Sequence, residues 1–360
     1  MKKFVQFGFT IGLMALSVSA MDRINVYKQK GAVAILKNEH KEVLAMIPDL
    51  ETKLREELFS EVQKSPHLRV LHLSGKSDRS NLHLLRAEGD ILEKFLQESN
   101  ELHTLKLLHI DCDCIRQPIF TKLPLTLQNL DLTGCRLLPS KSEPLLVSLK
   151  SCPKLTSLVL SKNKLLYNEN AEDFFNSLPQ TLEILKLGHC TLSVQQAAAL
   201  FKILPSLKNL RTLDLSFINL AILSSNAFQK CFPQSLERLD LSECEITCEQ
   251  SKVLLDTMST LKELQEVHLN ENKNIDCTTL KKLNKLPKLK TLSIRGVGLP
   301  KISEDFSSNI RIEVDREKAV LAESNYDFLK PPVSLVKMND GRYEWHSVGF
   351  NRHVGQYILL

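Results

Sequence analysis

The stretch "TLQNLDLTGCRL" at residues 126–137 combines two rhythms. Its apolar positions are Leu127, Leu130, Leu132, Cys135 and Leu137. Neither a helix period of about 3.6 residues nor strict strand alternation accounts for all of them. The central "LDL" alternates as a strand does, and the chain then changes direction at "TGC". The stretch therefore predicts a short strand followed by a tight turn.

The same frame returns along most of the chain. Its first leucines are Leu68, Leu102, Leu127, Leu155, Leu182, Leu210, Leu236, Leu264 and Leu289. The intervals between them run from 25 to 34 residues. Each copy follows L-x-x-L-x-L-x-x-(N/C)-x-L, the leucine-rich repeat pattern, whose positions are numbered one to eleven below. Nine copies at such even spacing indicate a repeat array.

The second half of each unit predicts a helix. Three pairs have capping-box spacing, in which a hydroxyl side chain caps the helix and a Gln or Glu follows three residues later. The pairs are Ser140 with Glu143, Ser193 with Gln196, and Thr247 with Gln250. Most units then reach a proline shortly before the next first leucine, as at Pro179 and Pro233. Since proline cannot continue a helix, each unit is expected to be strand, turn, helix and stop.

This order of elements predicts an α/β leucine-rich repeat solenoid. Stacked strands lie about 4.8 Å apart, whereas packed helices need about 8–10 Å. The helical side must therefore be longer than the strand side. The expected fold is a curved horseshoe with a parallel sheet on the concave side and helices on the convex side.

The pattern resembles the ribonuclease-inhibitor-like class of leucine-rich repeat proteins over about residues 67–300. The resemblance rests on the leucine frames, the Asn/Cys alternative at position nine and the helix-length intervals. It implies a horseshoe that holds other proteins without catalysis. Position nine departs from the pattern in four units, at Lys76, Ile110, Ile218 and Val297.

The nine cysteines raise a choice between buried thiols and disulfides. Asn163 and Asn272 at position nine can bond the turn backbone. The same position holds Cys135, Cys190 and Cys244, which are expected to be small, buried, reduced side chains. Two further cysteines that share a later slot, Cys248 and Cys277, are expected to be buried too. The competing hypothesis is one or two disulfides formed after export.

Four segments follow from these patterns. Residues 1–20, with two lysines, an apolar run and "VSA", are typical of a cleaved signal peptide and indicate a secreted or periplasmic protein. Residues 21–66 are expected to form a helical cap, with helices over 31–47 and 51–64. Residues 67–315 form the array and end in a strand at 309–315. Residues 316–360 form a C-terminal cap or tail, with a hairpin turn at "DG".

Several chemistries are not supported. The net charge of +5 is small and no block of five basic residues occurs, so nucleic acid is not an expected partner. The stretch "SGKS" at 74–77 lacks the first glycine of a phosphate-binding loop. The stretch "HIDCDC" at 109–114 lacks a second ligand pair for zinc. No membrane span is expected after signal removal, and no cofactor or metal is predicted.

The favoured function is non-catalytic protein binding through the concave face, against a host or envelope protein. The alternatives are a structural or envelope-associated repeat protein and, less favoured, an enzyme. The strand residues between the leucines should point into the concave side. The predicted partner-binding residues are Arg211, Asp214, Glu237, Arg238, Asp240, Glu266, His268 and, in the tail, Trp345. The tryptophan is either a cap residue or an aromatic anchor. The oligomeric state stays open.

Overall fold

The fold was analysed in a computed structural model of the chain. It describes residues 24–29, 32–37, 42–46, 52–65, 67–75, 82–83, 86–111, 120–137, 139–163, 175–275, 277–297, 310–314, 333–337, 343–351 and 356–359. The predicted signal peptide, residues 1–20, lies outside these ranges. The segment boundaries at residues 21, 67 and 316 stay predictions.

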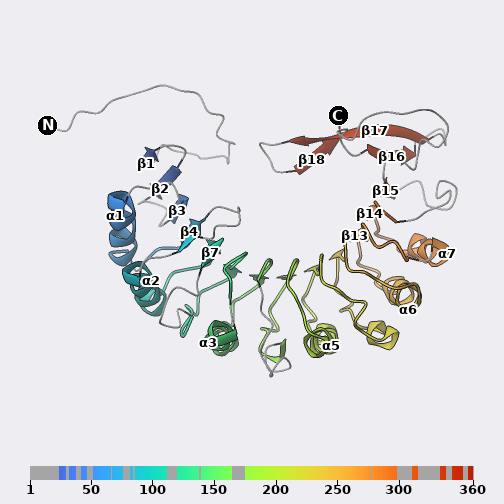
Figure 1. Cartoon of the computed structure of the whole chain (residues 1–360), viewed down its shortest axis with the longest axis horizontal. Helices are drawn as coiled ribbons and strands as arrows, with labels where there is room; N and C mark the ends of the chain where they lie inside the picture. The colour runs from blue at the N-terminus through green and yellow to red at the C-terminus, as the bar shows by residue number, and fades with distance from the viewer. Residues whose placement is uncertain are drawn as a thin grey trace.

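One long sheet runs through the molecule (Figure 1). Its order is β1-β2-β3-β4-β6-β8-β9-β10-β11-β12-β13-β14-β15-β16-β17-β18. The first strands are β1 Ile24–Gln29, β2 Ala32–Lys37, β3 Glu42–Met46, β4 Val70–Ser74, β6 Thr104–Leu108, β8 Asn129–Asp131, β9 Ser157–Val159, β10 Ile184–Lys186 and β11 Thr212–Asp214. The others are β12 Arg238–Asp240, β13 Glu266–His268, β14 Thr291–Ser293, β15 Arg311–Val314, β16 Val333–Lys337, β17 Tyr343–Asn351 and β18 Gln356–Leu359. A separate pair joins β5 Leu82–His83 and β7 Ile110–Asp111.

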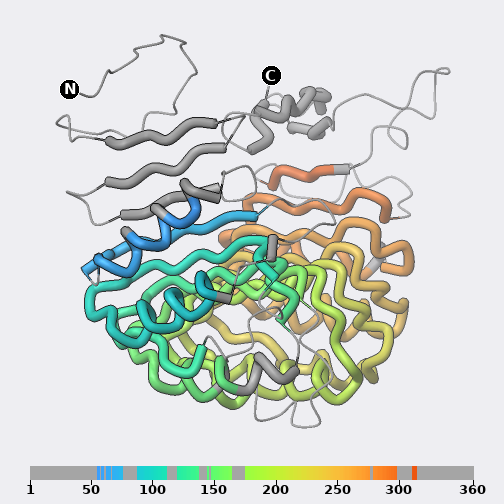
Figure 2. The backbone as a smooth tube through the Cα atoms, turned by 60° about the vertical axis from the view of Figure 1, so that its left-hand side comes forward, coloured from blue at the N-terminus to red at the C-terminus, as the bar shows by residue number. Residues whose placement is uncertain are grey.

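The predicted horseshoe is confirmed. Parallel pairing extends from β3 to β15. The α-helices lie on the outer side of this curved sheet, and Figure 2 shows successive turns of the chain stacked side by side. They are α1 Thr52–Gln63, α2 Arg86–Glu98, α3 Pro139–Lys150, α5 Val194–Ile203, α6 Cys248–Met258 and α7 Cys277–Leu280. Short 3-10 turns are η2 Leu204–Ser206, η3 Ser225–Phe228 and η4 Lys281–Lys285.

The leucine frame builds the core between sheet and helices. Every residue at positions one, four and six of the nine units is at most 5% exposed. Burying one such side chain contributes about 1.5–3 kcal/mol. One unit departs from the expected helix: after β11 the chain forms only the 3-10 turn η3, where buried Phe228 packs edge-on against Phe201 of α5. This unit spans 26 residues, against 28 in both of its neighbours, which leaves less chain for a helix.

The ends of the array differ in part from the prediction. The helix expected at 31–47 is wrong, because β2 and β3 occupy that segment and extend the sheet. Apolar "AVAIL" suits a strand as well as a helix, and pairing of β3 with the first unit decides between them. The second helix, over 51–64, is confirmed as α1. The strand expected at 309–315 is confirmed as β15, and β16 to β18 add antiparallel strands after it.

Two of the three predicted capping boxes are present. Ser193 and Gln196 at α5, and Thr247 and Gln250 at α6, each make both reciprocal hydrogen bonds. The box predicted at Ser140 is wrong, because α3 already begins at Pro139. Proline has a backbone angle suited to the first helical position, so the helix starts before the serine.

In five units the side chain at position nine links the unit to the preceding one. The side chains of Asn163 and Asn272 donate to position-six carbonyls, those of Leu132 and Leu241. Three thiols donate to the equivalent carbonyls: Cys135 to Leu107 at 2.8 Å, Cys190 to Leu160 at 3.2 Å and Cys244 to Leu215 at 3.1 Å. Cysteine can replace asparagine here because its thiol reaches the same acceptor. All three cysteines are buried and free, as predicted.

Cys248 was expected to be buried, and this is wrong. It is exposed as the first residue of α6, directly after the cap at Thr247. The side chain of Cys277 lies outside the described residues.

In the part of the chain that the structure describes, no helix has the length and apolar character needed to cross a membrane.

We expect the position-nine thiols to resist alkylation until the array unfolds. Burial raises the pKa of Cys190 to about 12 and raises the pKa of Cys244 as well, so neither forms thiolate at neutral pH. Replacing Cys135, Cys190 or Cys244 by alanine should lower the free energy of unfolding by about 1–2 kcal/mol, from a small cavity and a lost hydrogen bond. Native-state labelling counted by mass spectrometry tests the burial, with exposed Cys248 as the internal control. Labelling of the buried three as fast as Cys248 would contradict it.

Candidate functional site

The strand register places two columns of side chains on the concave face of β10 to β15. Position five forms the inner column, of Lys186, Asp214, Asp240, His268, Ser293 and Glu313. Position three forms the outer column, of Ile184, Thr212, Arg238, Glu266, Thr291 and Arg311. The residues between them at position four are buried. The register therefore brings together five of the predicted site residues, Asp214, Arg238, Asp240, Glu266 and His268. Arg211 and Glu237 precede β11 and β12 at position two and pair with each other.

Arginines neutralise two of the predicted acids. Arg211 pairs with Glu237 at 2.5 Å, and Arg238 pairs with Glu266 at 3.2 Å. Both arginine side chains are well exposed, at 59% and 61%. Exposed pairs of this kind contribute at most about 1 kcal/mol, because solvent screens them. These pairs therefore reduce the local charge of the face rather than hold the fold together.

Asp214 and Asp240 have a structural role as well. Asp214 Oδ1 accepts hydrogen bonds from the backbone and hydroxyl of Ser216, and Asp240 Oδ1 accepts from the backbone of Ser242. Each carboxylate thus caps the turn that follows its own strand. The two residues are register partners on neighbouring strands. Within the described residues no ion pair reaches either carboxylate, so the pair forms a small acidic centre on the face.

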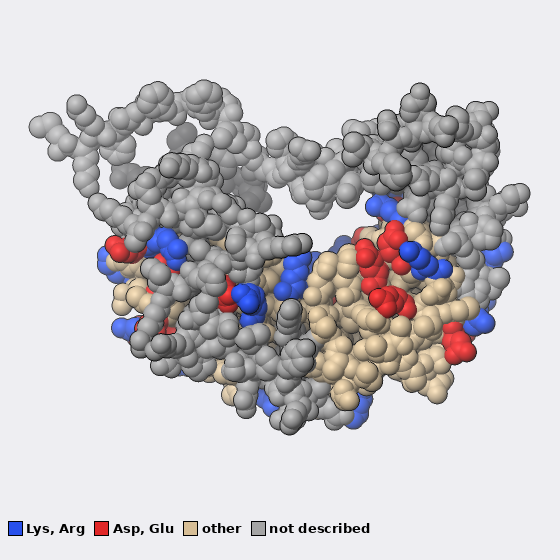
Figure 3. Space-filling view, viewed as in Figure 1, with Lys and Arg blue, Asp and Glu red and all other residues tan. Residues whose placement is uncertain are grey.

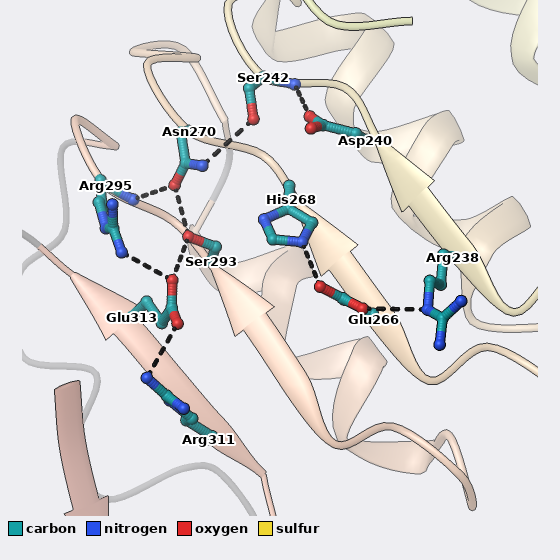
Figure 4. A network of polar contacts seen from close by, with 10 residues as sticks. All are labelled: Arg238, Asp240, Ser242, Glu266, His268, Asn270, Ser293, Arg295, Arg311 and Glu313. Carbon is teal, nitrogen blue, oxygen red and sulfur yellow. Dashed lines mark hydrogen bonds and ion pairs between the residues drawn. The ribbon is translucent and has the colours of Figure 1, made fainter. Parts of the chain in front are cut away.

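A hydrogen-bonded group, the concave network, extends from β12 to β15 (Figure 4). Its members are Arg238, Asp240, Ser242, Glu266, His268, Asn270, Ser293, Arg295, Arg311 and Glu313. Glu313 binds Arg295 at 2.8 Å and Arg311 at 3.3 Å. Ser293 Oγ lies 2.8 Å from Asn270 Oδ1 and 3.1 Å from Glu313 Oε2, and its single hydroxyl proton is donated to one of them at a time. These contacts hold polar side chains in place on open strands. Because the side chains are already ordered, binding a partner costs less of their conformational entropy.

His268 is the titratable centre of this network. Burial disfavours its charged form, but the hydrogen bond to Glu266 at 2.8 Å acts in the opposite direction. The negative charges of Asp240 on β12 and Glu313 on β15 add to that effect. The pKa of His268 is therefore raised above its ordinary 6.5. The same hydrogen bond lowers the pKa of Glu266, opposed by burial and helped by the charges of His268 and Arg238.

We expect His268 to stabilise the array in a pH-dependent way. Its pKa is higher in the folded than in the unfolded chain, so its contribution is complete below about pH 6.5 and disappears as pH rises through the raised value. The difference in free energy of unfolding between wild type and His268→Gln should therefore shrink from about pH 5.5 to about pH 8.5. Urea unfolding at both pH values measures it. A difference that grows with pH would show that the imidazole is not held in its charged form.

Position eight forms a further row of residues along the turns that follow the strands. Six of its residues have φ between 54° and 60° without being glycine: His109, Lys162, His189, Phe217, Glu243 and Glu271. Gly134 and Gly296, both at 67°, complete the row. Its amides donate to position-seven carbonyls of the next unit, as from Phe217 to Ser242 at 2.8 Å. We call these eight residues the rim ladder.

Side chains of the rim ladder pack from one unit onto the next. The rings of His189 and Phe217 stack, with centroids 3.7 Å apart and planes 17° from parallel. Both glycines lie beneath a neighbour's side chain, and a Cβ on either would collide with it. Sequence reasoning missed this row because position eight is a variable position of the repeat pattern. A signal in the sequence was that position eight, which the repeat pattern does not require to be apolar, is His, Phe and Glu in three successive units.

Trp345 is not part of the concave columns. It lies in β17, where its backbone pairs with Leu335 of β16. One strand, β16, thus separates it from β15, the last strand of the array, in the order of the sheet. Its side chain lies outside the described parts of the chain, so the choice between cap and anchor stays open.

Metal binding has no support in the described ranges. No group of three or more His, Cys, Asp or Glu side chains gathers there in a way that could hold an ion. From the rejected "HIDCDC" stretch, Asp111 instead pairs with Arg136 at 2.9 Å. Cys112 and Cys114 lie outside the described residues.

The architecture defines the chain as a leucine-rich repeat solenoid, with an open parallel sheet lined by variable residues. No family model and no curated protein matches the sequence. Among solved structures, a leucine-rich repeat protein of Leptospira interrogans is similar, with 18% identity over 74% of this chain and 80% of that one, at a TM-score of 0.35.

Proposed function

We propose that this chain is a non-catalytic scaffold that binds a protein partner through the concave face of β10 to β15. The carrying observation is that successive open strands display ordered, opposite charges instead of one repeated polar residue. We also propose that the chain belongs to the ribonuclease-inhibitor-like class of leucine-rich repeat proteins. The presence of Asn or Cys at position nine, with the same hydrogen bond to the preceding unit, supports this. A curved face of fixed side chains suits a folded partner better than a small molecule.

Affinity capture tests the proposed function. The purified array is immobilised and exposed to envelope and extracellular fractions, and the retained proteins are identified by mass spectrometry. A partner should be retained by wild type and by Val194→Ala, a change of an exposed side chain on convex helix α5. It should be lost from a variant with charge reversals on the concave face. Equal retention by all three proteins would contradict a concave site.

Export is a second element of the proposal, motivated by "KKF" and "VSA" at the start of the chain. Expressed with its own first twenty residues, the protein should be exported and should begin at or near Met21. Intact-mass measurement of the exported fraction checks this. An exported chain that still carries Met1 through Ala20 would contradict cleavage at that site.

A further inference from the structure

The rim ladder carries an exposed aromatic side chain at Phe217. Phe217 is 43% exposed and is one of four large apolar side chains that stand exposed among the described residues. Two of the others, Val147 and Val194, belong to convex helices. The phenyl ring follows β11, next to the inner column of the concave face, and stacks on exposed His189.

The φ of +60° at this position gives no reason to place a phenylalanine there. A left-handed backbone is unfavourable for a residue with a side chain, and glycine avoids that cost. Gly134 and Gly296 show that the ladder accepts glycine. Because the phenyl ring is exposed, it gains little stability from burial. Its stacking on one histidine therefore does not make it a core residue.

The rim ladder is acidic on one side of the ring, while Lys162 stands two positions away on the other side. Glu243 follows it in the rim ladder and Glu271 comes next, and both are exposed. In the described parts of the chain neither glutamate has an ion pair, and the same holds for the neighbouring Asp214 and Asp240. Figure 3 shows acidic side chains gathered on the side of the molecule where Figure 1 draws β13 and β14. The nearby arginines, Arg211 and Arg238, are already paired with glutamates.

His189 does not supply a positive charge that could pair with these carboxylates. Burial and the positive charge of Lys162 lower its pKa, against the opposing charges of Asp214 and Glu243. The ring is therefore uncharged at neutral pH and extends the aromatic surface. An aromatic face beside carboxylates that have no ion pair from the described residues is the environment that attracts a guanidinium or ammonium group.

We propose that the rim ladder docks a basic segment of the partner, with an Arg or Lys side chain seated on Phe217 beside Glu243. This inference rests on the proposed function and adds the chemistry of the partner. It also places the anchor at the edge of the concave face rather than at the concave network. Arginine fits better than lysine, because its planar group can stack on the ring while it bonds a carboxylate.

A displayed library of random peptides is the probe. Peptides selected on the wild-type array at low salt are synthesised, and their affinities are measured by fluorescence anisotropy. We expect them to be rich in Arg and Lys and to bind Phe217→Gly and Glu243→Lys at least about tenfold more weakly. Glycine accepts the left-handed backbone, so Phe217→Gly keeps the fold, which its melting temperature verifies. Val194→Ala, the exposed convex control, should bind as wild type does.

Two outcomes separate this inference from the proposed function. Peptides without basic residues, or peptides that bind Phe217→Gly as tightly as wild type but lose affinity for Glu266→Lys, would overturn the basic-segment inference and leave concave binding in place. Peptides indifferent to every concave and rim variant would contradict both. A library that yields no binder above background would count against the rim site, while protein capture still tests the scaffold.

Discussion

Replacing Asn272 by leucine should lower the free energy of unfolding by about 3–4 kcal/mol, because several buried polar groups lose their partner at once. Asn272 Nδ2 lies 2.8 Å from the carbonyl of Leu241 and 3.0 Å from that of Leu269. Its Oδ1 accepts from the amides of Cys244 and Ile246, both at 3.2 Å. The side chain itself is fully buried. Urea unfolding followed by circular dichroism measures the loss.

Asn272→Cys is the matched control. A thiol at this position can still donate to the carbonyl of the preceding unit, as Cys135 does to Leu107. It cannot replace both bonds to the amides, so we expect an intermediate cost of about 1–2 kcal/mol. A leucine variant as stable as the cysteine variant would mean that the position-nine hydrogen bonds do not stabilise the stack.

The double change Asp214→Lys and Asp240→Lys should weaken binding of a captured partner at least about tenfold, or ~1.4 kcal/mol. The reason is that the two adjacent carboxylates form an acidic centre with no ion pair from the described residues. If the partner offers basic groups, wild-type binding should weaken as salt increases and the variant should lose this dependence. Isothermal titration calorimetry at two salt concentrations measures both effects.

Asp214→Asn with Asp240→Asn is the control for folding. An amide oxygen can still accept from the turn amides of Ser216 and Ser242, so the fold should persist while the charge disappears. Binding by this variant should fall between wild type and the lysine variant. If the lysine variant binds as tightly as wild type, the partner's site lies elsewhere, and the tail around Trp345 becomes the next candidate.

The fold could be predicted because every unit of the array repeats the same sequence signals. The leucines at positions one, four and six, the capping residues and the prolines all fit one strand-turn-helix unit, and errors in single units do not change the stack. The prediction failed where repetition ends, at 31–47, because the short apolar run there suits a strand as well as a helix. It also failed at Ser140, where a proline starts the helix earlier than the cap signal indicated.

The candidate site was predicted only in part, for a physical reason. Strand alternation identifies which residues face the concave side, so Asp214, Asp240 and His268 could be named from the sequence. Pairing between units depends on side-chain conformation, which alternation does not contain. Glu313 and Arg295 were missed for this reason, although they complete the network around His268. The rim ladder was missed because nothing in the leucine frame identifies position eight as left-handed.

Site-specific photo-crosslinking tests the central claim, binding by the concave face, most directly. A photoreactive phenylalanine analogue is placed at Thr212 or Thr291 on the concave strands, or at Val147 or Val194 on the convex helices. All four proteins are irradiated with the captured partner. The account predicts crosslinks from the two strand positions and none from the helix positions. Crosslinks from the convex positions alone would contradict it.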